Sequence, residues 1–129
     1  MANKLLNWQT WLKQGDDYRK AVSPKSTIRF GTDIRYNLIS MSLESYTMAI
    51  LDFHHNLPEN HTFLDLMSAL ETVIPVEDKL KRRILKYESI QSICSIDKYS
   101  RINPTEEEIT DLTGAIDEIC LIAHKICIP

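Results

Sequence analysis

Apolar residues recur every three or four positions along most of this chain, and that spacing limits the folds it can adopt. No stretch alternates apolar and polar residues for long enough to predict a β-strand. The five prolines fall between the periodic stretches, where helices are expected to end. We therefore predict an all-α protein: a mostly antiparallel up-and-down bundle of four long helices plus one short helix.

The periodic stretches predict helices over residues of about 3–22, 32–55, 62–74 (the short one), 76–94 and 104–126. The second carries apolar residues over more than half of its circumference, which indicates a central helix that several neighbours contact. In the last helix Pro104 suits the first helical position, and three glutamates follow where the helix dipole favours negative charge. Its expected core face consists of Ile109, Leu112, Ile116, Ile119, Ala123 and Ile126.

Composition narrows the class of protein. A length of 129 residues predicts a single domain over 1–129, and 43% hydrophobic with 26% charged residues is ordinary for a soluble globular protein. The net charge of −3 argues against non-specific nucleic-acid binding by the whole surface. Three cysteines without a CxxC pair predict a reducing compartment, neither a disulfide framework nor a structural zinc site. With no apolar run of about 18 residues, we expect no membrane span and a cytoplasmic location.

Three of the four histidines, His54, His55 and His61, cluster where the second predicted helix ends. Adjacent residues on a helix point about 100° apart, so His54 and His55 are poorly placed to chelate one ion together. An imidazole near a helix C-terminus caps free carbonyls instead, and we prefer that interpretation to metal binding. No metal site is predicted, and no cofactor.

His124, on the last predicted helix, is a weak candidate for a phosphoacceptor. In the pattern of four-helix phosphotransfer domains, a Lys-Gly pair closely follows the histidine. In this chain the residues KICIP follow His124 instead. The cysteines occupy core positions of the helical pattern, and no nucleophile stands beside a base in the sequence. No glycine-rich phosphate loop is present either, so no catalytic residue is predicted.

A basic stripe runs along the helix predicted over 76–94. Lys79, Arg82, Arg83 and Lys86 stand at i, i+3, i+4 and i+7, on one side of that helix. They lie in its first half, where the helix dipole disfavours positive charge, so helix stability does not explain them. They are candidates for binding an anion or nucleic acid, with a solvated face held by internal salt bridges as the alternative.

Ile90 and Ile93 continue the same stripe beyond the charged residues. They lie off the main core stripe of their helix, and a monomer gains nothing from exposing them. We therefore predict that they belong to an interface and that the protein is a homodimer.

The segment LISMSLESYTMAILDFHHNLPENHTFLDLMSAL resembles the core of the HEPN family, the higher-eukaryote and prokaryote nucleotide-binding helical bundles. Glu44, Tyr46 and Ala49 match the E-x-Y-x-x-A-like run of the family's central helix, and His61 lies in the loop that follows. Further similarity is carried by Leu64, Leu66, Ile96, Asp97, Tyr99 and Arg101, so that the resemblance spans about 30–127.

Catalytic HEPN members are RNases built on an Arg-x(4–6)-His motif. None of the six arginines stands five to seven residues before a histidine, and upstream of His124 those positions hold Asp117, Glu118 and Ile119. An acid in place of the arginine would repel the scissile phosphate. The resemblance therefore implies a member that is not an active RNase through this motif.

Two functions follow from the resemblance and the stripe. The first is a non-catalytic interaction module that dimerises or pairs with a small nucleotidyltransferase, in a toxin–antitoxin-type pair. The second is an RNA- or nucleotide-binding protein that uses the basic stripe. This alternative leaves open an RNase activity whose residues come together in space rather than in a sequence motif.

Overall fold

The computed structural model describes residues 7–23, 31–58, 63–86 and 104–128, and these ranges contain helices and no strand. The helices are α1 (Trp8–Ala21), α2 (Thr32–Phe53), α3 (Phe63–Glu71), α4 (Asp78–Lys86) and α6 (Glu106–Ile126). The all-α prediction is confirmed for the described ranges. The second half of the helix predicted over 76–94, with Ile90 and Ile93, lies outside them.

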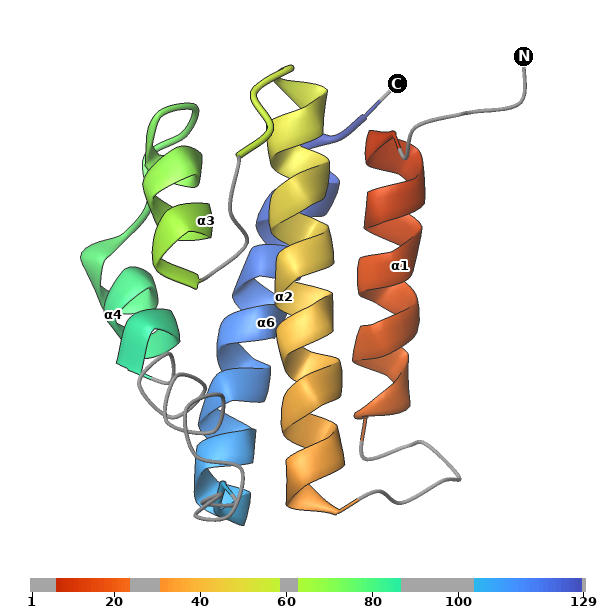
Figure 1. Ribbon diagram of the computed structural model, residues 1–129, viewed down its shortest axis with the longest axis vertical. Helices are drawn as coiled ribbons and strands as arrows, with labels where there is room; N and C mark the ends of the chain where they lie inside the picture. The colour runs from red at the N-terminus through yellow and green to blue at the C-terminus, as the bar shows by residue number, and fades with distance from the viewer. Residues whose placement is uncertain (1–6, 24–30, 59–62, 87–103, 129) are drawn as a thin grey trace.

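Helix α2 is the centre of the bundle, as its apolar circumference predicted. It packs against α1 on one side and against α6 and α3 on the others (Figure 1). Every residue from Ser45 to Leu51 is buried, the polar Thr47 included. Each fully buried large side chain in this stretch contributes about 1.5–3 kcal/mol of transfer free energy, so α2 organises most of the core.

The chain directions differ from a simple up-and-down bundle. Helices α1 and α2 are antiparallel, but α2 and α6 run in the same direction (Figure 1). An ion pair between Arg35 and Glu106 joins the first turns of α2 and α6, as their parallel order allows. In the order of the chain, α3 and α4 come after α2 and run up and then down in Figure 1, and α6 begins at the end of the bundle where α2 began.

Polar caps decide where α1 and α6 begin, and they correct two predicted starts. The side chain of Asn7 accepts a hydrogen bond from the Thr10 amide at 3.0 Å, so α1 begins at Trp8 rather than near residue 3. Thr105 and Glu108 form a reciprocal capping box, which makes Thr105 the N-cap of α6. Pro104 therefore precedes the cap instead of occupying the first helical position.

The C-terminus of α2 agrees with the predicted role of one histidine. His54 is the C-cap, and its Nδ1 lies 2.9 Å from the carbonyl oxygen of Ile50. His55 adopts the left-handed conformation, with φ of 56°, that commonly reverses a chain after a helix. His61 lies outside the described residues.

Candidate functional site

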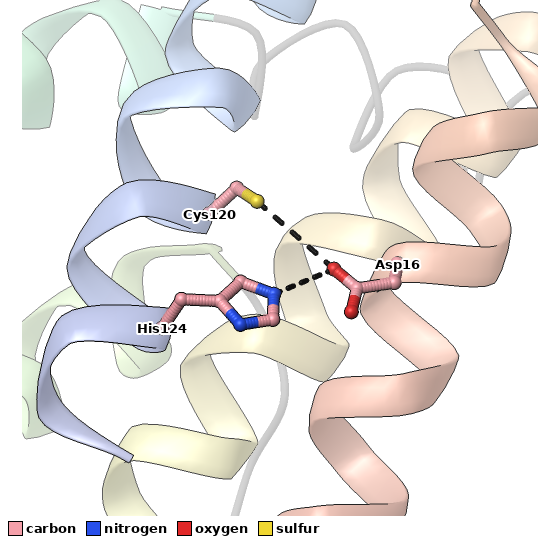
Figure 2. Close-up of side chains that lie close together, drawn as sticks. All are labelled: Asp16, Cys120 and His124. Carbon is pink, nitrogen blue, oxygen red and sulfur yellow. Dashed lines mark hydrogen bonds and ion pairs between the residues drawn. The ribbon is translucent and has the colours of Figure 1, made fainter. Parts of the chain in front are cut away.

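A polar cluster lies where α1, α2 and α6 meet. Asp16 comes from α1, and Cys120 and His124 come from successive turns of α6 (Figure 2). Tyr46 joins them from α2. Residues four apart on a helix share a face, so the thiol and the imidazole both point toward α1. Asp16 projects into the same space from the facing helix.

One carboxylate oxygen is the centre of this cluster. Asp16 Oδ1 lies 2.8 Å from His124 Nε2 and accepts a hydrogen bond of 2.5 Å from the Tyr46 hydroxyl. The Cys120 Sγ lies 4.0 Å from the same oxygen and donates weakly to it. The sulfur, nitrogen and oxygen atoms of Asp16, Cys120 and His124 all lie within 4.8 Å of one another.

The cluster is buried at its base and open at its rim. Cys120 is 8% exposed, whereas the side chains of Asp16 and His124 are 30% and 45% exposed. Burial, together with the hydrogen bond to Asp16, raises the pKa of Tyr46 far above its usual value of 10.0. The Tyr46 hydroxyl therefore stays protonated and remains a donor to the carboxylate.

Close contact between α1 and α2 holds Asp16 in place. The Tyr46 ring covers Gly15 so closely that an added Cβ would lie 2.6 Å from the ring. The Ser42 hydroxyl, one turn earlier on α2, donates to the Gly15 carbonyl at 2.8 Å. Two side chains of the central helix thus fix the backbone beside the carboxylate.

A second polar tie joins α1 to α6 beside the cluster. Arg19 donates to Asp117 at 2.7 Å, one turn along from Asp16 on α1 and from Cys120 on α6. The hydrogen bond to Asp117 is the largest of the effects that raise the pKa of the Arg19 guanidinium. The carboxylates of Asp16 and Asp117 outnumber the Arg19 guanidinium. The surroundings of Cys120 and His124 therefore favour a cation over a phosphate.

The geometry does not resemble a nucleophilic cysteine site. A reactive thiolate is usually activated by a neighbouring imidazolium or by a helix N-terminus. Here the His124 ring bonds to Asp16 rather than to the sulfur, and the Cys120 thiol donates weakly to the same carboxylate. What the cluster offers is a set of three different ligand atoms: one sulfur, one nitrogen and one oxygen.

Sequence reasoning missed this cluster, although one signal was present. Cys120 and His124 are separated by three residues on a helix, the spacing that lets two ligands share a face. The sequence interpretation treats His54 and His55 as the possible metal-binding pair, His124 as a weak phosphoacceptor candidate, and Cys120 as a core residue. Asp16 stands 104 residues before Cys120, so only the packing of α1 on α6 brings it there.

The four residues of the predicted basic stripe do not share one environment. Arg83 is directed at α6, where it pairs with Asp111 and Glu118 and donates to the Asp111 carbonyl at 2.9 Å. Arg82 is exposed and makes a 3.4 Å contact to the Asp78 carbonyl. Lys79 and Lys86 are exposed as well.

An open groove of about 550 Å³ lies between the start of α4 and the C-terminal half of α6. Its apolar walls come from Pro75, Val76, Leu80, Leu121 and Ile122, and two glutamates, Glu77 and Glu118, complete the lining.

Comparison with known proteins gives no relative. No known protein family, no curated protein and no solved structure matches the chain. Among the helices that the structure describes, none combines the length and the apolar character that crossing a membrane requires.

Proposed function

We propose that this protein is a HEPN-like helical interaction module that acts by binding another protein, either a second copy of itself or a small nucleotidyltransferase. The family part of the proposal rests on the resemblance over residues of about 30–127. An all-helical fold with a buried central helix is compatible with it.

The observation that carries the interaction role is the groove between α4 and α6. Leu121 stands on its lining with 72% of its surface exposed, beside the apolar Val76 and Ile122. An exposed leucine that borders an apolar concavity enlarges the contiguous apolar surface there, and contiguous surface of this kind marks interaction sites. The groove with Leu121 at its edge is therefore the candidate docking surface.

The alternative function, RNA or nucleotide binding by the basic stripe, has less support. Arg83 already faces two carboxylates of α6, so a phosphate would have to displace them. A loss of the Arg83 pairing would leave Asp111 and Glu118 without that cation. Without Arg83, the stripe keeps two lysines and one guanidinium, that of Arg82. Only Arg82 among these three residues could then bind a phosphate in the bidentate way.

Leu121→Asp tests the interaction role. The side chain is exposed, so the substitution should leave the helix content unchanged while placing a charge on the groove. Light scattering at high micromolar concentration should give about twice the 14.9 kDa chain mass for the parent and the chain mass for Leu121→Asp. Met41→Asp is the matched control, because Met41 is an exposed apolar residue on α2, away from the groove.

The pairing with a nucleotidyltransferase is tested by co-expression of this chain with a small nucleotidyltransferase from the same source. A complex that survives purification and is lost with Leu121→Asp supports the proposal. A parent chain that is monomeric and also fails to form such a complex contradicts it, and binding of RNA by that monomer would favour the alternative.

A further inference from the structure

The Asp16–Cys120–His124 cluster offers three metal-ligand atoms that the proposed docking to another protein does not use. We propose that Asp16, Cys120 and His124 bind one zinc ion, or a divalent transition metal of similar preference, at the interface of α1 and α6 (Figure 2). The site is independent of the groove between α4 and α6, so it stands whether or not the chain docks to a partner.

The ligand set selects the class of metal. Thiolate sulfur and imidazole nitrogen are the ligands that zinc prefers, and carboxylate oxygen commonly completes such sets. A thiolate excludes magnesium and calcium, which take oxygen ligands. Among the described residues, this is the one place where three groups of these types converge.

The separations need small adjustments. Zinc bonds of about 2.0–2.3 Å at tetrahedral angles place ligand atoms about 3.3–3.7 Å apart. The observed separations are 2.8 Å between Asp16 Oδ1 and His124 Nε2 and 4.0 Å between Asp16 Oδ1 and Cys120 Sγ, and the ligand atoms of Cys120 and His124 lie within 4.8 Å of each other. Side-chain shifts of about 1 Å reach the required geometry, so the helices can stay where they are.

The surroundings supply what such a site requires around its ligands. Metal-binding carboxylates are usually held by a further hydrogen bond, and the Tyr46 hydroxyl gives one to Asp16 at 2.5 Å. On binding, Cys120 loses its thiol proton and His124 presents Nε2 without a proton, so two negative ligands offset the charge of the ion. Three protein ligands leave one position, on the exposed side, for water or an added ligand.

The first experiment titrates the tag-free, reduced full chain with Zn²⁺ in a calorimeter and with Co²⁺ in a spectrophotometer. We expect one ion per chain, and for cobalt the intense visible bands of a tetrahedral site with a thiolate charge-transfer band in the near ultraviolet. Cys120→Ser and His124→Gln should weaken zinc binding by about a hundredfold or more, and Tyr46→Phe by about 10- to 100-fold.

Matched controls come from the same chain. Cys127→Ala removes another buried cysteine, and His55→Ala removes an exposed histidine, so both should bind zinc as the parent does. Cys120→Ser and His124→Gln variants that bind zinc with parental affinity would overturn the proposal. A parent chain that takes up no stoichiometric zinc would overturn it too, leaving the cluster as a hydrogen-bonded tie between helices.

A measurement without variants covers the case in which a substitution disturbs folding. X-ray absorption of the zinc-loaded parent should show one sulfur at about 2.3 Å and nitrogen or oxygen ligands at about 2.0 Å. A zinc shell with no sulfur, or with two or more, would contradict the assignment to Cys120.

Discussion

Gly15 allows α1 to pack tightly on α2, since the Tyr46 ring occupies the space where a Cβ would lie. Gly15→Ala gains helix propensity of about 1 kcal/mol but forces a fully buried ring to move. Overpacking of this kind typically costs about 1–3 kcal/mol, so we expect a net loss of stability. Urea unfolding followed by circular dichroism measures the change.

Gly114 provides the matched control, because it is also inside a long helix. An added Cβ there would lie 2.9 Å from Arg83 Nη2, the far end of a flexible side chain that can shift. Gly114→Ala should therefore cost less than Gly15→Ala, because the gain in helix propensity is set against a shift of one guanidinium rather than of a buried ring. Equal effects of the two substitutions would contradict the tight contact assigned to Gly15.

Cys127 gives the protein a pH-dependent contribution to stability. Burial, and to a smaller extent the Asp52 carboxylate, raises the pKa of this thiol to about 11 from 9.0. Between these values the unfolded chain ionises the thiol while the folded chain keeps it protonated, so stability is full below pH 9 and falls as pH rises toward 11. Replacing Cys127 by Ala should make this alkaline decline shallower in urea unfolding.

The control for that prediction is the difference in stability between the parent and Cys127→Ala at neutral pH. Below pH 9 the parent and Cys127→Ala should differ by a constant amount that reflects packing alone. Identical slopes of stability against pH between 9 and 11 would show that the Cys127 thiol is not protected from ionisation.

At the scale of helices, Arg83 is what joins α4 to α6 electrostatically. It contacts Asp111 and Glu118 from a position that is only 25% exposed. Arg83→Gln should destabilise the fold by about 1 kcal/mol, and the loss should shrink at high salt because these pairs remain partly exposed. Thermal melting at low and high salt measures both effects.

Arg82 is the control for this prediction, one position earlier on the same helix. It is exposed, and its contact among the described residues is a backbone carbonyl at 3.4 Å, so Arg82→Gln should change stability by less than about 0.5 kcal/mol. If Arg82→Gln destabilises as much as Arg83→Gln, the pairing with α6 is not the cause. Loss of RNA affinity in both variants would instead support the stripe as a binding surface.

For the whole molecule, the proposed docking groove predicts that stability depends on concentration. A chain that buries Leu121 against a second copy gains stability by mass action, so its melting temperature should rise with protein concentration. The same series for Leu121→Asp should be flat. A parent melting temperature that does not change with concentration would limit the groove to partners other than this chain.

Local pattern predicted the helices well because each one is specified by its own residues. The core face of α6 is buried from Ile109 to Ala123 as its spacing indicated, with Ile126 half-buried at the end. The starts of α1 and α6 were missed because the N-terminal caps at Asn7 and Thr105 set the first helical residue, and neither the apolar spacing nor Pro104 specifies a cap.

The sequence by itself determined that the described chain is helical and that α2 is central, because apolar periodicity is a local property that sets which faces must be buried. It did not determine the parallel order of α2 and α6, the pairing of Arg83 with α6, or the meeting of Asp16 with Cys120 and His124. These depend on which helix faces which. Contacts between residues some 30 to 100 positions apart are set by packing, which no short stretch of sequence encodes.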